Sequence, residues 1–304
     1  MRPDIQRAFD HLRAGTALDP PPQSITELVA LIREQTETYG DVEPRPPLSG
    51  VRCEPVDAGG VAAEWLIPDG DLRDCTMVYL HGGGWTAGSL NSHRLMVAAI
   101  ASATGMPVLN VDYRLAPENP FPAGLDDSLT ALRWAESNRP SGAGRPSRIF
   151  LGGDSCGGNL AAAACLSLVE RGGRLPDRLV LVSPMLETAC HPDRPDRGDP
   201  VASNDGIALV PQIYGIEPAQ VDDPLVSPMK APDRLLSGFP PTLIQASCAE
   251  FFNWDARSFT ARLSGAGVRV TLSLWPEMPH VWHLFANLLP EAKAATEEIA
   301  MFLR

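Results

Sequence analysis

Short apolar runs alternate with longer helical patterns through most of this chain, and no other feature constrains its fold as strongly. The apolar runs lie at 77–80, 108–111, 149–151, 179–182, 242–246 and 268–274, and the helical patterns at 91–104, 124–138, 157–172 and 252–265. Two earlier runs, Val51–Val56 and Val61–Ile67, flank the turn sequence Ala58-Gly59-Gly60 and predict a hairpin. Strands that alternate with helices form a mostly parallel sheet covered on both faces. The sequence therefore predicts an α/β fold with eight strands.

Two amphipathic helices precede the first strand. Apolar residues recur at helical spacing at Ile5, Ala8, Phe9 and Leu12, and again at Ile25, Leu28, Val29 and Ile32. The second helix begins with the capping-box pattern of residues 24–27 and ends before Gly40, and a proline-rich linker follows at 41–50. These helices either add to the core or form a lid over a site, and we favour the lid.

A long segment from Pro184 to about Gly238 interrupts the alternation of strands and helices. It is rich in proline and aspartate, and only Ile207–Tyr214 has a helical pattern. Excursions of this length inside a compact domain are usually functional or belong to a lid. One main domain with a small cap is therefore the expected organisation of the 304 residues.

The net negative charge of the chain argues against some classes of partner. Its formal net charge is -12, so nucleic acid and anionic membranes would be repelled. No apolar run approaches the ~18 residues that span a bilayer, and residues 1–5 lack the apolar region of a secretory signal. We expect a cytoplasmic protein without stable membrane insertion. The six cysteines lack paired spacing, which indicates free thiols and neither disulfides nor zinc.

The sequence Gly153-Asp154-Ser155-Cys156-Gly157 has the G-x-S-x-G pattern of a nucleophile elbow. It follows the strand at 149–151 and opens an alanine-rich helix, which is the context that this turn requires. The glycines allow the tight turn that projects Ser155 above the sheet as the catalytic nucleophile. Because the elbow aims its central residue outward, we expect Cys156 to contribute its backbone N–H to an oxyanion hole rather than its thiol to catalysis.

Three consecutive glycines follow the strand at 77–80, in the sequence His81-Gly82-Gly83-Gly84-Trp85. Without side chains there, backbone N–H groups can approach a ligand oxygen and stabilise a tetrahedral oxyanion. Gly83 and Gly84 are the expected donors. A flexible turn or a phosphate-binding loop is the alternative, but neither a G-K-[ST] nor a G-x-G-x-x-G pattern follows.

A general base is expected late in the chain if the catalytic order is serine, acid, histidine. His280 and His283 are the only histidines after residue 191. His280 follows the last predicted strand, in a loop at the carboxyl edge where a sheet presents catalytic groups, so we favour it over His283. The two histidines have helical spacing for a metal, but no H-E-x-x-H pattern is present, and we predict no metal site.

Five motifs in the same order make the chain resemble the hormone-sensitive lipase family of bacterial esterases. They are HGGGW at 81–85, DYRLAPE at 112–118, GDSCGG at 153–158, DPLVSP at 223–228 and PHVWH at 279–283. The resemblance implies an α/β-hydrolase fold with a catalytic domain at 51–304 and a helical cap at 1–50, to which 185–224 contributes. It further implies that residues 112–118 are scaffold beneath the oxyanion loop, and that a homodimer forms through the edge strand 268–274.

The family usually has an aspartate as the acid of its triad, and here the matching position departs from that pattern. Alignment without gaps on residues 266–268 and on His280 places Glu250 at the acid position and Asp255 at the start of the following helix. A glutamate can orient the imidazole equally well. We therefore predict Glu250 as the acid, with Asp255 as the alternative.

Together these motifs predict a serine carboxylesterase that acts through an acyl-enzyme on short- to medium-chain esters, with no metal or organic cofactor. Four aromatic residues are candidates for an apolar acyl pocket: Trp85, Tyr214, Phe251 and Trp282. An amidase or arylesterase on the same triad and a non-catalytic small-molecule binder remain as alternatives. The intact serine, histidine and acid argue against the binder.

Overall fold

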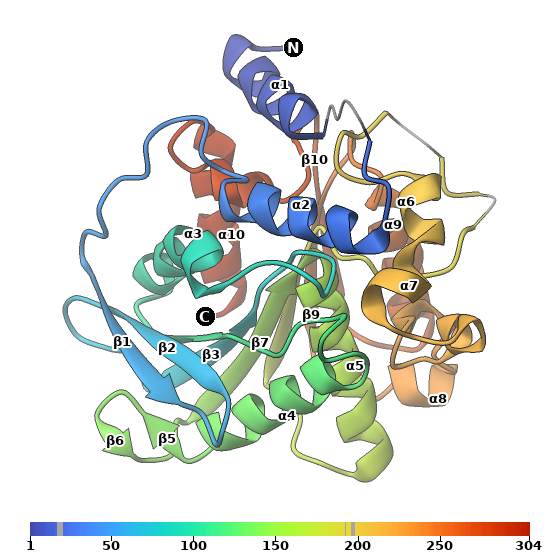
Figure 1. Cartoon of the computed structure of the whole chain (residues 1–304). Coiled ribbons are helices and arrows are strands. Elements are labelled where there is room, and N and C mark those ends of the chain that lie inside the picture. Colours follow the sequence, from blue (N-terminus) through green and yellow to red (C-terminus); the bar gives the residue numbers. More distant parts are fainter. Residues whose placement is uncertain (17–20, 192, 196–197) are drawn as a thin grey trace.

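The central element of the computed structural model, which describes residues 1–16, 21–191, 193–195 and 198–304, is a mixed β-sheet. Its strands are Val51–Asp57 (β1), Ala62–Pro68 (β2), Cys75–Leu80 (β3), Val108–Val111 (β4), Arg148–Asp154 (β7), Arg178–Val182 (β8), Thr242–Ser247 (β9) and Val270–Trp275 (β10). Within the described residues the sheet has eight strands in the order β1-β2-β4-β3-β7-β8-β9-β10. Figure 1 shows this sheet among the surrounding helices. The pairs β1–β2 and β2–β4 are antiparallel and the others are parallel. The predicted eight-stranded, mostly parallel sheet is confirmed.

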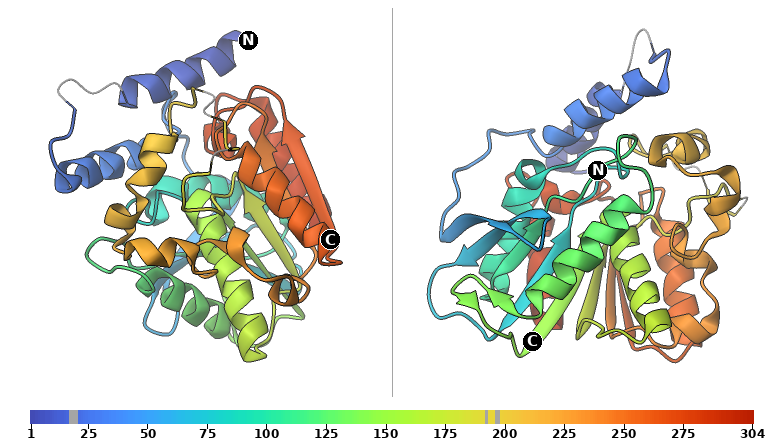
Figure 2. Two further views of the ribbon diagram at one scale, coloured as in Figure 1. Left: turned by 90° about the vertical axis from the view of Figure 1, so that its right-hand side faces the viewer. Right: turned by 60° about the horizontal axis from the view of Figure 1, so that its bottom comes forward.

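Helices cover both faces of this sheet (Figure 2). The longer ones are Pro3–Thr16 (α1), Ile25–Glu37 (α2), Leu90–Thr104 (α3), Ala123–Ala135 (α4), Ser155–Arg171 (α5), Asn253–Gly265 (α9) and Pro290–Phe302 (α10). Helices α3 and α10 pack together on one face, while α4, α5 and α9 lie on the other. A hydrophobic core lies on each face of the sheet, and alternate residues of β3 pack into one or the other. Met77 and Tyr79 face α3, whereas Val78 and Leu80 face α5.

The long segment between β8 and β9 contains several short elements. They are Asn204–Ala208 (α6), Val210–Tyr214 (α7), Asp233–Leu236 (α8) and the 3-10 turns Pro218–Asp222 (η1) and Pro228–Lys230 (η2). The single helix predicted at 207–214 is thus two helices. Pro211 lies in the first turn of α7, and in one continuous helix its ring would clash with the carbonyl of Ile207.

The start of the last strand differs from the prediction, and two small elements were not predicted. Strand β10 begins at Val270 rather than Val268, because the N–H of Val268 closes the end of α9 by donating to Leu263 O. A two-stranded ribbon of Asn138–Arg139 (β5) and Gly142–Ala143 (β6) follows α4, and Trp282–Phe285 (η3) forms one 3-10 turn before α10.

The amino-terminal helices are anchored at the end of the sheet where the parallel strands finish (Figure 1). Helix α1 buries the predicted residues Ile5, Ala8, Phe9 and Leu12 in a cluster that includes Trp282 and Phe285. Ser24 caps α2 by accepting from Glu27 N at 3.2 Å, but the predicted capping box is only half formed, because Glu27 Oε2 accepts from Gln23 N at 2.6 Å instead of from Ser24 N. Helix α2 also contacts α7, so the first fifty residues meet the segment between β8 and β9.

All six cysteines are free thiols. Cys156 and Cys165, both on α5, are fully buried in the hydrophobic core. Among the described residues, no helix combines the length and the apolar character that crossing a bilayer requires.

Candidate active site

Ser155 lies at the junction of β7 and α5 in a strained conformation. Its φ is 52°, a left-handed value that non-glycine residues rarely adopt outside functional turns. A Cβ at Gly153 would collide with the carbonyl of Gly157, and a Cβ at Gly157 would collide with the carbonyl of Leu80. Only glycine fits at both positions, so the local sequence produces the tight elbow that exposes Ser155 to a cavity.

The glycine loop after β3 lines the same cavity with Gly83 and Gly84. Both have positive φ, 121° and 62°, and a Cβ at Gly83 would collide with the backbone of Ala87. A hydrogen bond joins this loop to the nucleophile elbow, since Trp85 N donates to Cys156 Sγ at 3.1 Å. Burial raises the pKa of the Cys156 thiol to about 12, so the thiol remains protonated and acts as a structural contact.

Cys156 is the second residue of α5, so its backbone N–H belongs to the first helical turn, where no intrahelical acceptor exists. This N–H therefore lies beside Ser155 at the positive end of the helix dipole. The side chain of Cys156 is directed into the core, fully buried, and is not part of the cavity wall.

His280 follows β10 in a loop and also lines the cavity. Its Nδ1 is 2.6 Å from Glu250 Oε2, and both residues are almost completely buried, at 4% and 1% exposure. The other carboxylate oxygen of Glu250 accepts from Ser247 N at 2.6 Å. Burial disfavours the imidazolium, but the hydrogen bond and the charge of Glu250 outweigh it and raise the pKa of His280.

Asp255, the alternative acid, contacts Arg194 and not His280. Its carboxylate forms a fully buried ion pair with Arg194 at 2.7 Å and accepts from the N–H groups of Leu186 and Glu187 at 2.8 and 3.1 Å. Burial raises the pKa of Asp255 to about 6 despite this ion pair. Of the two carboxylates, it is Glu250 that contacts His280.

His283, the alternative base, is buried away from the cavity. Its Nε2 is 2.9 Å from Gln245 Oε1, and burial lowers its pKa to about 3, so the ring is neutral. No group of three or more metal-binding side chains occurs in the part of the chain that the structure describes.

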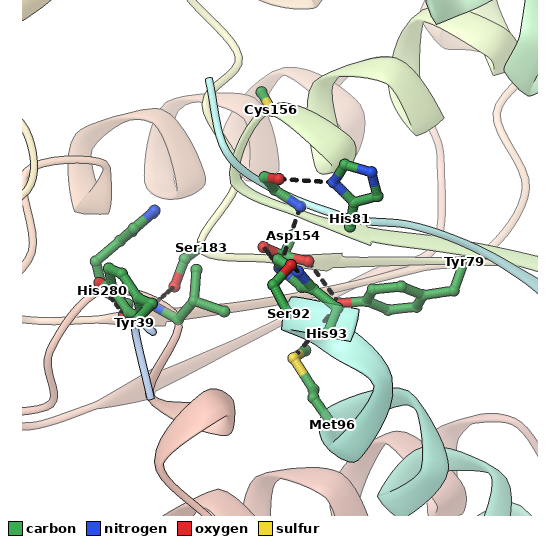
Figure 3. A network of polar contacts seen from close by, with 12 residues as sticks. Tyr39, Tyr79, His81, Ser92, His93, Met96, Asp154, Cys156, Ser183 and His280 are labelled. Atoms are coloured by element: carbon green, nitrogen blue, oxygen red, sulfur yellow. Dashed lines mark hydrogen bonds and ion pairs between the residues drawn. The ribbon is translucent and has the colours of Figure 1, made fainter. Parts of the chain in front are cut away.

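Two further residues, which the sequence analysis missed, hold the loop of His280 (Figure 3). Tyr39, at the end of the α2 region, donates from its hydroxyl to His280 O at 2.8 Å. On the other side, Val281 N donates to Ser183 Oγ at 3.2 Å, which supports a positive φ of 47° at Val281. No motif signals these contacts, because residues 39, 183 and 281 are distant in sequence.

The cavity above Ser155 has a volume of about 590 Å³ and mostly apolar walls. Its floor is formed by the glycine loop, the elbow and the His280 loop. Its sides are formed by helix α2 and by helices α6 and α7 of the segment between β8 and β9, chiefly through Leu28, Leu31, Ile32, Ile207, Val210 and Ile213.

Comparison with known proteins gives the family. A family model for the alpha/beta hydrolase fold matches residues 77–284. A crystal structure of an esterase from the bacterial hormone-sensitive lipase family is 37% identical, with a TM-score of 0.87, over 100% of this chain and 98% of that one. The chain belongs to the hormone-sensitive lipase family of α/β hydrolases.

Curated relatives agree on the class of reaction. An acetyl-hydrolase of Streptomyces hygroscopicus is 38% identical over 258 residues, which cover 82% of this chain and 81% of that protein. Carboxylesterase NlhH of Mycobacterium tuberculosis is 37% identical over 224 residues, which cover 72% and 70%. This member of the hormone-sensitive lipase family is an ester hydrolase.

The aromatic residues expected around the acyl pocket of this ester hydrolase need correction. Trp85 lines the cavity, whereas Tyr214, Phe251 and Trp282 do not. Tyr214 stacks behind Trp85 with ring centroids 4.3 Å apart, Phe251 lies under the Arg194 guanidinium, and Trp282 packs in the cluster below α1. Phe252, the neighbour of Phe251, is the aromatic residue of that loop that reaches the cavity.

Proposed function

We propose that this esterase hydrolyses carboxylic esters through an acyl-enzyme on Ser155. Ser155 Oγ attacks the ester carbonyl while His280 accepts the serine proton. Glu250 holds the imidazole through Nδ1 and offsets the positive charge that develops on it. His280 then protonates the leaving alcohol, and in the second half of the reaction it activates a water molecule that releases the acid.

The oxyanion of each tetrahedral intermediate would lie between the N–H groups of Gly83, Gly84 and Cys156. One preorganised donor of this kind is typically worth about 2.7–4 kcal/mol of transition-state stabilisation. The positive φ values of the two glycines and the position of Cys156 in the first turn of α5 support this assignment.

We further propose that residues 1–50 and 185–224 form a cap that encloses the acyl chain. The apolar side chains of α2, α6 and α7 around the cavity support this role. A cavity of about 590 Å³ lies in the usual range for small-molecule sites and suits short- to medium-chain acyl groups. Long lipid chains would need a larger apolar surface.

The observation that carries the proposal is the convergence of Ser155 and His280 on one cavity, with Glu250 at 2.6 Å from the imidazole. The experiment is hydrolysis of p-nitrophenyl esters from acetate to laurate by the wild type and by Ser155→Ala. We expect an optimum at short to medium chains and loss of nearly all activity in Ser155→Ala.

A matched series of p-nitroanilides separates the esterase from an amidase, since amide cleavage requires protonation of a poorer leaving group. Faster turnover of anilides than of esters would favour the amidase. Turnover of esters by Ser155→Ala at the wild-type rate would refute the proposed nucleophile.

A further inference from the structure

A second buried polar cluster lies beside the glycine loop, and the proposed reaction does not use it (Figure 3). It contains His93 from α3, Asp154 from the end of β7 and Tyr79 from β3. His93 and Asp154 are each 1% exposed, yet both form part of the cavity wall. Tyr79 donates from its hydroxyl to Asp154 Oδ1 at 3.0 Å.

His93 of this cluster and the neighbouring His81 hold the two polar backbone groups of Gly82, which immediately precedes the two proposed oxyanion donors. Gly82 N donates to His93 Nε2 at 3.3 Å, and Gly82 O accepts from His81 Nδ1 at 2.8 Å. Burial lowers the pKa of His81 to about 4, so the ring is neutral and its proton lies on Nδ1 for this contact.

Gly82 also packs directly on the Asp154 carboxylate. A Cβ at position 82 would collide with Asp154 Oδ2, so only glycine allows this approach. The same carboxylate oxygen is 3.3 Å from His93 Nε2. A protonated Nε2 would donate to Asp154, whereas an unprotonated Nε2 accepts from Gly82 N, so the contact with the loop peptide requires the tautomer whose proton is on Nδ1.

The orientation of the His93 ring is fixed from its other side by the capping box of α3. Ser92 Oγ accepts from Ser89 N at 2.9 Å and can donate to Ser89 O at 3.0 Å. Its remaining lone pair then accepts from His93 Nδ1, 2.9 Å away. This chain of contacts directs Nε2 toward Gly82.

We propose that His93 is a positioning residue for ester hydrolysis, which holds the Gly82 peptide so that the N–H groups of Gly83 and Gly84 face the oxyanion. A run of three glycines has no side chains with which to fix its own conformation. Oxyanion donors stabilise the transition state only when they are oriented before the reaction. The inference rests on the proposed function, because it assumes that Gly83 and Gly84 are the donors.

The test compares His93→Leu, which removes the acceptor, with His93→Gln, whose amide can replace it. For p-nitrophenyl butyrate we expect His93→Leu to lower kcat by roughly 10- to 100-fold, less than loss of a complete donor, with KM within about twofold. His93→Gln should recover most of kcat. A trifluoromethyl ketone, which forms a tetrahedral adduct, should bind His93→Leu more weakly by a similar factor.

A wild-type kcat in His93→Leu, equal losses in the Leu and Gln variants, or a rise in KM alone would each overturn the inference. If His93→Leu does not fold, Ser92→Ala removes the partner of Nδ1 from a partly exposed position, and an unchanged kcat there overturns it equally. Ser155→Ala in the same assay separates the two proposals. Activity in that variant would refute the proposed nucleophile, whereas the His93 variants test the loop.

Discussion

At the scale of single residues, Glu250 and Asp255 show how two nearby carboxylates acquire different roles from their partners. Glu250 contacts His280, and Asp255 contacts Arg194. We predict that Glu250→Gln lowers kcat by about 10²- to 10⁴-fold, because the imidazole loses the group that orients it, while stability changes little. Steady-state kinetics and urea unfolding measure both quantities.

The matched control is Asp255→Asn. This variant should retain most of kcat but lose about 3–5 kcal/mol in the free energy of unfolding, since the fully buried Arg194 loses its counter-charge. A larger loss of kcat in Asp255→Asn than in Glu250→Gln would exchange the two roles.

The pH dependence of the reaction should report the environment of His280. The proposed base accepts a proton only when neutral, and Glu250 raises its pKa above the ordinary 6.5. We therefore expect kcat/KM to fall as the pH drops through a value above 6.5. In Glu250→Gln the residual activity should persist to lower pH, because the charge that favours the imidazolium is gone. An acid limb that stays in place in that variant would contradict this assignment.

Sequence patterns could locate the candidate site residues whose positions depend on local backbone geometry. The elbow and the glycine loop need glycine at fixed positions, so Ser155 and Gly83 can be located from spacing alone. Residues that act through distant contacts, such as Tyr39 and His93, have no such pattern. The choice of Phe251 over Phe252 failed for the same reason: which of two adjacent side chains faces the cavity depends on the loop conformation.

At the scale of elements, the strands could be predicted because buried parallel strands are continuously apolar. The sequence patterns do not predict helix α10, and they predict a single helix where α6 and α7 lie. These three helices lie outside the alternating pattern of strands and helices, in parts of the chain where packing against other segments determines which residues become helical. The apolar face of α2 was predicted, and its position over the cavity required the tertiary structure.

Helix α2 provides a test of the proposed cap. Leu31 lines the cavity, and Leu31→Trp should reduce the space for the acyl chain. We expect the ratio of kcat/KM for octanoate over acetate to fall about 10-fold, the effect of excluding one or two methylenes. Ala30→Trp, on the exposed side of the same helix, is the control and should leave the ratio unchanged. An unchanged ratio in Leu31→Trp would argue that acyl chains bind elsewhere.

At the scale of the whole molecule, β10 is the last strand of the sheet and pairs only with β9 within the described chain. An unpaired edge strand can pair with a second copy. We predict that the wild type is a dimer, with twice the chain mass of 32.6 kDa by light scattering. Thr271→Glu, at an exposed position of β10, should favour the monomer through repulsion between copies. Ser137→Glu is a control on another surface. A monomeric wild type would contradict this prediction.

The central claim is that Ser155 carries the acyl group during ester hydrolysis. The most direct test is mass spectrometry of the enzyme quenched during turnover of p-nitrophenyl butyrate, followed by peptide mapping. We predict a mass gain of one butyryl group on the peptide that contains Ser155 in the wild type, and no such gain in Ser155→Ala. Steady turnover without any acylated peptide, or acylation of another residue at a rate that accounts for turnover, would contradict the account.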